Sequence, residues 1–460
     1  MSFHLPTYKP EKMNLWVHLS GLVWILMLVI NMNGLFLLYT PDSAAYVLNS
    51  RELLVPGDRS VFYSLYLYVC SQVGEIFGIS SLWISILPIF FMIYGMLYQW
   101  VQRFFFPNSP VWQFVCLSLA GVLTPFPWFI IQIMPDVFTG ILFLSSVLFL
   151  VENVRFYQLV WGSITLASTL MHNGNLIVLT IVVLVLLLSK SVWEILMIQA
   201  RRIYYLGIVS IVGWLSVLMS NYIGGNGWTT AKCSHIFIVA QMSETGVLKR
   251  YLEKYCQEEP SIMCQYKDSL PEHAYGFIWP QDGILMKTGG WHHSDSLYGK
   301  IIKTVLTDPE LLLHYTGSAL KSTSYQLISL GVGDGIFPVD TSSTLASELK
   351  NRYPTDYKTL FSDHPQQTGS IAFSDLNEFY RKSAIVLFLA SLISIYVIPR
   401  KNQFAWMALS FVFVLSNAFA TSVFANVLMR LNTRAFWILM VVCLFLVLKT
   451  ISHKLIKKVQ

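Results

Sequence analysis

The sequence contains few charged residues. Only 12% of its 460 residues are Asp, Glu, Lys or Arg, against roughly 25% in ordinary soluble proteins. Hydrophobic residues make up 55% of the chain, and the mean hydropathy is +0.56. This balance excludes an ordinary soluble protein, and many apolar stretches reach the roughly 20 residues that a membrane-spanning helix needs. The chain is therefore predicted to be an all-α polytopic membrane protein.

Several familiar motifs are also absent. The sequence shows no internal repeat, no CxxC or zinc-type Cys/His spacing, and no Walker loop, hydrolase elbow or dinucleotide fingerprint. The net charge of +6 does not indicate nucleic-acid binding, because Lys and Arg lie at the ends of apolar runs. Among six cysteines, Cys256 and Cys264 enclose a loop short enough to close with a disulfide in an oxidising compartment.

Ten apolar segments are predicted to cross the membrane: 14–39, 79–102, 111–129, 136–152, 157–171, 174–189, 203–221, 383–399, 403–423 and 433–450. This count places most basic residues near the spans on one side, namely Lys9, Lys12, Arg103, Arg155, Lys190, Arg201, Arg202, Arg400, Lys401, Lys454, Lys457 and Lys458. The positive-inside rule makes that side, and both termini, cytoplasmic. The first segment is too long for a signal peptide and lacks a small-x-small cleavage site after it.

The predicted spans divide the chain into three regions. Residues 1–221 form an N-terminal transmembrane module of about seven helices, with interfacial helices expected over 42–54 and 60–73 in its first external loop, 41–78. Residues 222–382 are expected to form a large mixed extracytoplasmic loop domain, and 383–460 a C-terminal module of about three helices. The expected location is a bacterial inner or plasma membrane.

Three short polar motifs interrupt the apolar segments: Pro41-Asp42-Ser43, Pro135-Asp136 and His172-Asn173-Gly174-Asn175. Counting the crossings places all three on the side opposite the basic residues. A carboxylate beside hydrocarbon costs about 2.5–3.5 kcal/mol on insertion scales, so such a group usually has a function. The motifs therefore predict a site at the outer membrane surface.

Asp42 directly follows the first span and begins an interfacial helix, for which Ser43 is a candidate N-cap. A partly desolvated carboxylate suits a general base when a nearby cation keeps it ionised. Arg51 and Arg59 are the nearest cations in the sequence. The alternative is that Asp42 only caps the helix that follows it.

Asp136 and His172 each leave two interpretations open. A first-turn carboxylate such as Asp136 either binds substrate or caps a helix, which stabilises by about 1 kcal/mol. His172 lies in a hairpin between short spans, where it hydrogen-bonds a sugar hydroxyl, holds the Asp residues in place, or closes the turn. The turn explains Gly174 and Asn175 but gives no reason for His172.

Two basic pairs lie on the external side, against the inside bias. Arg430 and Arg434 flank the last external loop, and Arg381-Lys382 precede the eighth span. Arg binds phosphate through paired N–H groups, so both pairs are candidate ligands for a lipid phosphate. Anchoring of these long side chains to lipid headgroups is the alternative.

The layout resembles the GT-C superfamily of polytopic glycosyltransferases, especially the branch of protein mannosyltransferases and aminoarabinose transferases. In that superfamily an acidic residue follows the first span and opens a loop of interfacial helices, as Pro41-Asp42-Ser43-Ala44-Ala45-Tyr46 does here. Asp58-Arg59-Ser60-Val61-Phe62-Tyr63 is similar to the Arg, small residue and Tyr with which the family's loop ends. Asp136 matches a second acid in the next external loop, and Met429–Trp437 is similar to an Arg-containing stretch before the last span. The resemblance covers residues 1–190 and, more loosely, the last external loop.

The resemblance implies a GT-C-like fold and transfer of a hexose or pentose from a polyprenyl-phosphate carrier, with inversion and with Asp42 as the catalytic base. Two further groups are expected at the site: Asp136, His172, Asn173 and Tyr63 for the substrate, and Arg59, Arg381, Lys382, Arg430 and Arg434 for the phosphate. The expected partners are the lipid-linked donor, membrane lipids and an extracytoplasmic glycan, lipid or protein acceptor. No cofactor or metal ligand is assigned. A divalent metal is left open, because Ser43 stands where many relatives carry a second acid.

Two other classes of protein are alternatives. A transporter or flippase of a lipid-linked or small polar substrate predicts ionisable residues at mid-membrane depth and broken helices in matching halves, which the sequence does not show. A membrane O-acyltransferase would use His172 with a nearby Asn, but that interpretation leaves Asp42 and the interfacial loop unexplained.

Overall fold

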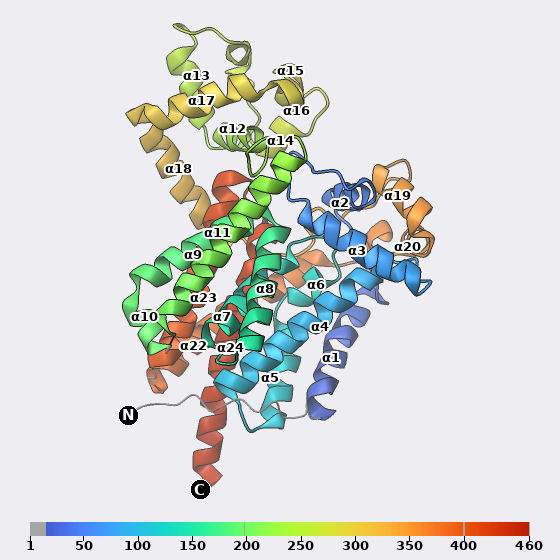
Figure 1. The fold of residues 1–460 in the computed structure, drawn as a ribbon, viewed down its shortest axis with the longest axis vertical. Helices are drawn as coiled ribbons and strands as arrows, with labels where there is room; N and C mark the ends of the chain where they lie inside the picture. The colour runs from blue at the N-terminus through green and yellow to red at the C-terminus, as the bar shows by residue number, and fades with distance from the viewer. Residues whose placement is uncertain (1–14, 197, 399–400, 460) are drawn as a thin grey trace.

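The computed structural model describes residues 15–196, 198–398 and 401–459. This part of the chain is helical and contains no strand; an isolated parallel bridge joins Leu38 to Gln132 (Figure 1). Lys9, Lys12 and Arg400 lie outside the described residues, as do the side chains of Lys401, Lys457 and Lys458.

A helix lies at each of the ten predicted spans: α1 (Leu15–Met32), α4 (Trp83–Trp100, continued by a π-helical turn over Val101–Phe105), α5 (Pro110–Leu123), α7 (Val137–Val151), α8 (Arg155–Met171), α9 (Asn173–Leu188), α11 (Ala200–Ile223), α22 (Phe373–Val397), α23 (Lys401–Phe424) and α24 (Met429–Val459). Six described helices are long and apolar enough to cross a membrane, namely those over Leu15–Met32, Trp83–Phe105, Ala200–Ile223, Phe373–Val397, Gln403–Phe424 and Met429–Leu455. The chain is thus a helical protein with the features of a multi-pass membrane protein. The count of ten crossings and the GT-C-like arrangement stay predictions.

Four predicted span limits differ from the helix ends by six residues or more: those at 39, 129, 383 and 450, where α1 ends at Met32, α5 ends at Leu123, α22 begins at Phe373 and α24 ends at Val459. α1 ends at Met32 rather than at 39, because Asn33 adopts a left-handed φ of 52° and the chain then runs extended past Leu38, whose N–H donates to Ile131 O at 2.9 Å. α22 begins at Phe373, well before the predicted start at 383. Its first turns are polar, and Asn377 holds Val332 there through its side-chain amide, with the Val332 N–H to Asn377 Oδ1 distance at 2.7 Å.

Residues 41–78, the predicted first external loop, contain two helices as expected. They are α2 (Pro41–Glu52) and α3 (Phe62–Ile76). The N-cap of α2 is Thr40 rather than Ser43, because the Ser43 hydroxyl accepts the Thr40 N–H at 2.9 Å from inside the first turn. α2 packs against α19 (Thr344–Arg352), where Arg51 donates to Glu348 at 3.0 Å.

Residues 233–311 build a second hydrophobic core, separate from the core of the membrane helices. Their helices lie at the top of Figure 1: α12 (Ser234–Glu244), α13 (Val247–Tyr255), a 3-10 turn over Ile262–Tyr266, α14 (Ala274–Ile278), α15 (Ile284–Lys287), α16 (Gly290–His293), α17 (Asp295–Thr307) and α18 (Pro309–Ile328). The predicted disulfide between Cys256 and Cys264 is formed there. Buried residues from Leu330 onward join the larger core instead, together with α20 (Pro354–Leu360) and α21 (Pro365–Thr368). The predicted region 222–382 therefore includes parts of both cores.

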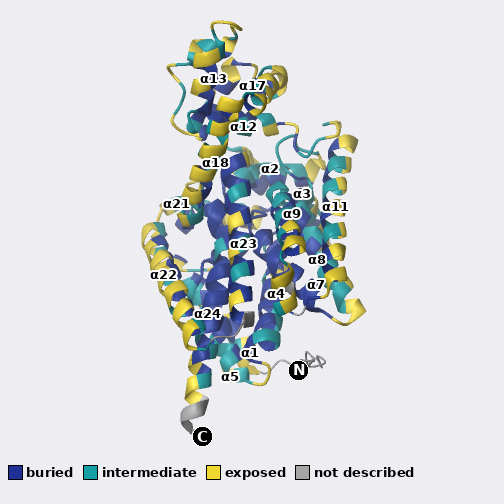
Figure 2. Cartoon of the chain, turned by 90° about the vertical axis from the view of Figure 1, so that its left-hand side faces the viewer, coloured by how far each residue is buried: buried dark blue, intermediate teal, exposed yellow. Residues whose placement is uncertain are grey.

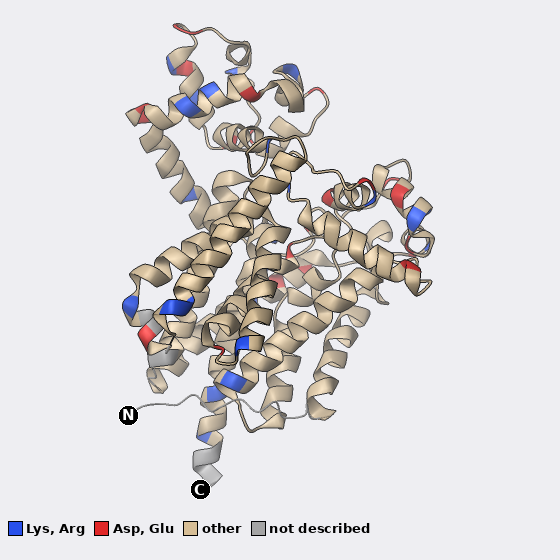
Figure 3. Ribbon diagram, in the orientation of Figure 1, with Lys and Arg blue, Asp and Glu red and all other residues tan. Residues whose placement is uncertain are grey.

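The surface of the membrane helices is apolar and unevenly charged. α1 and α22 expose large hydrophobic side chains such as Leu22, Ile30, Ile385 and Leu389, as expected for lipid contact (Figure 2). The end of the molecule where α24 ends, including α10 (Lys190–Ile195), carries mostly basic residues, whereas the opposite end carries both signs (Figure 3). This asymmetry agrees with the positive-inside rule, and the orientation of the termini stays a prediction.

Candidate functional site

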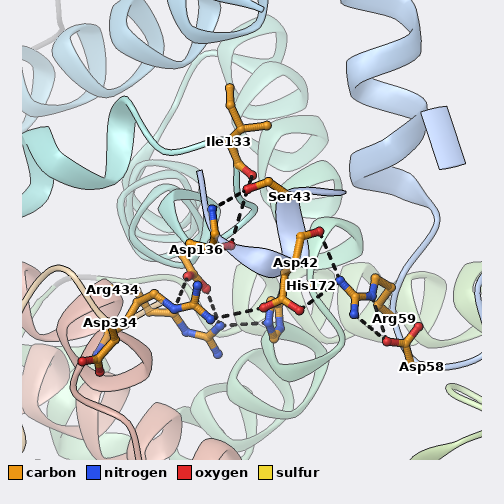
Figure 4. A network of polar contacts seen from close by, with 11 residues as sticks. Asp42, Ser43, Asp58, Arg59, Ile133, Asp136, His172, Asp334 and Arg434 are labelled. Carbon is orange, nitrogen blue, oxygen red and sulfur yellow. Dashed lines mark hydrogen bonds and ion pairs between the residues drawn. The ribbon is translucent and has the colours of Figure 1, made fainter. Parts of the chain in front are cut away.

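Four helices begin at one place and carry ionisable or imidazole side chains there (Figure 4). Asp42 is the second residue of α2, Asp136 and His172 directly precede α7 and α9, and Arg430 and Arg434 lie in the first turns of α24. Helix N-termini carry partial positive charge. The predicted motifs, far apart in the sequence, therefore meet in one electropositive setting, which we call the acid–arginine cluster: Asp42, Arg59, Asp136, His172, Arg430 and Arg434.

Asp42 is the accessible carboxylate of the cluster, with 32% of its side chain exposed. Its Oδ1 lies 3.2 Å from Arg59 Nη1, and its Oδ2 lies 3.4 Å from Arg430 Nη2. Arg59 is oriented by Asp58, at 2.6 Å between Nη2 and Oδ2. Of the two cations suggested by the sequence, Arg59 reaches Asp42, whereas Arg51 pairs with Glu52 and Glu348.

Asp136 is the buried carboxylate of the cluster, with 1% of its side chain exposed. Its Oδ1 accepts from Arg434 Nη1 at 2.9 Å, and its Oδ2 lies 3.4 Å from Arg430 Nε. Its backbone occupies the N-cap position of α7, but its side chain makes no capping hydrogen bond. The capping interpretation is therefore wrong, and Asp136 instead joins the two α24 arginines.

His172 both closes a turn and contacts the cluster. Its Nδ1 accepts from the Gly174 N–H at 3.0 Å, and its Nε2 lies 2.9 Å from Arg434 Nη1. Each ring nitrogen therefore lies opposite an N–H donor. Protonation of the imidazole to its cationic form would place a ring N–H against one of these donors. Burial, reinforced by the nearby Arg434, lowers the pKa of His172 to about 3. The imidazole is therefore neutral at pH 7 and poorly suited to act as a general base.

The two α24 arginines keep unpaired N–H groups. Arg434 is fully buried, donates from Nε to Asn417 Oδ1 at 3.2 Å, and has no partner for Nη2 within the described part of the chain. Arg430 has 9% of its side chain exposed and likewise has no protein partner for Nη1 among the described residues. Leaving a buried donor unpaired costs about 1–3 kcal/mol. Such donors therefore point to a bound acceptor group.

Two glycines keep backbone close to these free donors. A Cβ at Gly174 would lie 3.2 Å from Arg434 Nη2, and a Cβ at Gly335 would lie 3.8 Å from Arg430 Nη1. Gly335 also has a φ of +77°, which disfavours other residues. Asp334 beside it accepts the Arg430 backbone N–H at 3.0 Å and so holds this loop over the start of α24.

Four predicted site residues form their hydrogen bonds, ion pairs or ring contacts with residues outside the acid–arginine cluster. Arg381 and Lys382 are exposed; Arg381 Nε donates to Asn377 O at 3.2 Å, and Lys382 pairs with Glu378 at 2.5 Å. Neither residue forms a hydrogen bond or ion pair with the cluster within the described part of the chain, since α22 begins earlier than expected and leaves both side chains exposed. Their assignment to the phosphate site stays a prediction. Asn173 donates to Thr230 O at 3.2 Å. Tyr63 is fully buried against Tyr46, with ring centroids 5.0 Å apart.

Sequence reasoning missed three residues that support the cluster. Asp58 orients Arg59, Asp334 holds the Arg430 backbone, and Asn417 accepts from Arg434. Asp334 lies in the glycine-rich segment Gly331–Gly335, whose composition is typical of a turn but does not indicate which residue the turn contacts. Asn417 lies inside an apolar span, and a polar residue within such a run is the signal that the sequence offers.

No family model, curated protein or solved structure matches the chain. Among the residues that the structure describes, no three His, Cys, Asp or Glu side chains are placed to hold a metal ion. The acid–arginine cluster must therefore be interpreted from its own geometry.

Proposed function

We propose that the chain is a membrane glycosyltransferase that moves a sugar from a polyprenyl-phosphate carrier to an acceptor hydroxyl on the extracytoplasmic side. One observation carries the proposal: the partly exposed carboxylate of Asp42 lies beside Arg430, and Arg430 and Arg434 both keep buried, unpaired N–H groups. A base beside anion-binding donors is the pair of groups that displacement of a phosphate by a hydroxyl requires.

Each group has a role in the proposed step. Asp42 accepts the proton of the acceptor hydroxyl, and the oxygen forms a bond to the anomeric carbon. The bond from that carbon to the phosphate oxygen breaks, with inversion, and its electron pair leaves on the lipid phosphate. Arg430 and Arg59 lie next to Asp42 and stabilise the growing charge by hydrogen bonds to the phosphate oxygens.

The buried half of the cluster positions Arg430 and Arg434. Asp136 contacts both guanidinium groups, and neutral His172 contacts Arg434. Two buried cations without a counter-ion are unfavourable. The Asp136 carboxylate stabilises the two neighbouring guanidinium groups by pairing with both. In this proposal Asp136 and His172 are positioning residues, and the sugar contacts expected of them from the sequence are replaced by contacts to arginine.

Binding of the donor also changes the partners of Asp42. Arg430 is shared between Asp42 and Asp136 at 3.4 Å each, which is longer than a well-formed charge-assisted hydrogen bond. A phosphate that occupies the unpaired Arg430 Nη1 would compete for the same guanidinium. Asp42 then loses part of its ion pairing and becomes a better base when the donor is present.

The two alternatives find less support. An O-acyltransferase would need His172 as a base, but both ring nitrogens face N–H donors. A transporter would place its site between discontinuous helices near the membrane midplane, whereas these groups lie where α2, α7, α9 and α24 begin.

The proposal is tested with Asp42→Asn in the producing cell, with lipid-linked sugars measured by mass spectrometry of lipid extracts. We expect loss of the glycosylated product and accumulation of the donor, since removing a general base costs roughly 100-fold or more in rate. Asp363→Asn is the matched control, because Asp363 is exposed and distant in sequence from the cluster. Normal product without donor accumulation in Asp42→Asn, at wild-type protein levels, would contradict the proposal.

A further inference from the structure

A polar cavity lies away from the acid–arginine cluster. It has a volume of about 440 Å³ and is formed where α3 ends, α4 approaches and α19 ends, at the right of Figure 1. Its lining contains both charges and hydroxyl groups: Ser71, Glu75, Gly78, Ile79, Ser80, Asn351, Arg352 and Tyr353. None of these residues belongs to the acid–arginine cluster.

The walls of this cavity are fixed by the turn between α3 and α4. Gly78 adopts a φ of +68°, and the Ile79 N–H donates back to Gly74 O at 2.8 Å, so the chain reverses tightly after α3. Asp356 from α20 then accepts the Leu82 N–H at 2.7 Å and the Ser81 hydroxyl at 2.6 Å. The two sides of the cavity are thereby held together.

The cavity contains two charges without a charged partner. Arg352 donates to the hydroxyls of Ser50 and Ser71, at 3.4 and 3.2 Å, and no carboxylate of the described residues lies within ion-pair distance. Glu75 accepts a hydrogen bond from Gln72 at 3.4 Å and likewise forms no ion pair within the described ranges. A ligand with one anionic and one cationic group would complement both.

An apolar stripe leads to the cavity. Leu65, Val69, Val73 and Ile76 of α3 are 41%, 52%, 39% and 79% exposed, and their spacing of three and four residues places them on one helix face. Ile79, which lines the cavity, is 45% exposed and continues this surface. A helix with such a stripe lies along the membrane surface with the stripe toward the acyl chains. The cavity is thus at the level of lipid headgroups.

We propose that this cavity binds the headgroup of a zwitterionic phospholipid that carries a primary ammonium group. Arg352 and the neighbouring hydroxyls hydrogen-bond the phosphate, Glu75 accepts N–H bonds from the ammonium, and the acyl chains lie along the α3 stripe. A soluble carbohydrate would use the polar lining but would leave the exposed apolar stripe without a partner. This inference does not depend on the proposed transferase activity.

The test uses delipidated protein in detergent and native mass spectrometry, with phosphatidylethanolamine, phosphatidylcholine or phosphatidylglycerol added one at a time. We expect phosphatidylethanolamine to bind about tenfold more tightly than phosphatidylcholine, whose ammonium has no N–H group to donate to Glu75. Glu75→Gln should remove this preference without weakening phosphatidylglycerol, and Arg352→Gln should weaken all three about tenfold.

Matched variants keep the test interpretable. Lys358→Gln, at an exposed position of α20, removes a charge outside the cavity lining and should change nothing. Because Arg352 also holds two serines, Ser80→Phe provides a second probe that fills the cavity from an exposed position, and it should abolish binding. Equal binding of the three lipids to the unmodified protein, an unchanged preference in Glu75→Gln, or displacement of lipid by a soluble oligosaccharide such as maltotriose would each overturn the proposal.

Discussion

Two basic pairs near the start of long helices show how position decides what an arginine does. Arg430 and Arg434 on α24 are buried beside Asp136, whereas Arg381 and Lys382 on α22 are exposed. In the predicted topology both pairs lie against the inside bias, and the sequence suggested the same phosphate-binding role for both. The α24 residues are four apart and so share one helix face, and that face meets three other helix beginnings. The α22 residues are adjacent in the sequence, and both side chains are exposed.

The difference is also one of cost. On α22 the exposed Lys382–Glu378 pair is separated by four residues, and such surface pairs contribute little to stability. On α24 two guanidinium groups are removed from water and depend on Asp136 for a counter-charge. The α24 pair is therefore expensive to build and fragile to single changes, while the α22 pair is neither.

The largest expected effect is that of Asp136→Ala. Removing the carboxylate leaves two buried arginines without their shared partner, and breaking a buried ion pair costs about 3–5 kcal/mol. We expect the midpoint of thermal unfolding in detergent, measured by intrinsic tryptophan fluorescence, to fall strongly. Asp42→Ala is the control, since Asp42 is 32% exposed and Asp136 stays in place; it should change stability far less. Equal stability losses in the two variants would remove the distinction between buried and accessible halves of the cluster.

The positions of the helices and the gathering of the polar motifs were predictable from the sequence, whereas the contrast between the two basic pairs was not. Apolar runs located a helix at each predicted span, and Pro41-Asp42 correctly indicated the start of a helix after the first span. The meeting of Asp42, Asp136 and His172 followed from counting crossings. The partner of each carboxylate did not, because pairing depends on which faces of α24 and α22 turn inward. Asp334 and Asn417 were missed for the same reason, since a loop and an apolar span give no sign of the guanidinium groups they contact.

A second prediction concerns the geometry of Arg430. Lys at this position keeps the charge but presents a compact ammonium that cannot bridge Asp42, Asp136 and a phosphate at once. We expect Arg430→Lys to lower transferase activity roughly 10- to 100-fold with little change in stability. Activity is measured as conversion of the accumulated lipid-linked donor in isolated membranes. Full activity would show that charge alone suffices, and the contrast with α22 would then rest on burial only.

A third prediction concerns the pH dependence of stability that neutral His172 gives to the acid–arginine cluster. The pKa of His172 is about 3 in the folded protein, against its ordinary value of 6.5, so protons bind the unfolded chain more tightly. Stability contributed by neutral His172 is present above pH 6.5 and falls as the pH decreases toward 3, by at most about 1.4 kcal/mol per pH unit. We expect His172→Gln to flatten the decline of the unfolding midpoint between pH 6.5 and 5. An identical slope in the variant would mean that His172 is protonated in the folded protein.

The smallest expected effect is that of Arg381→Ala with Lys382→Ala. Both side chains are exposed, and the Lys382–Glu378 ion pair is of the kind that contributes about 0–1 kcal/mol. The double variant should therefore keep its unfolding midpoint and its conversion of donor, whereas Arg430→Ala with Arg434→Ala should lose activity. The two double variants remove the same formal charge, so a general electrostatic attraction for the donor would affect both. A comparable loss of activity in the α22 variant would return Arg381 and Lys382 to the phosphate-binding set and show that the donor also contacts the exposed side of α22.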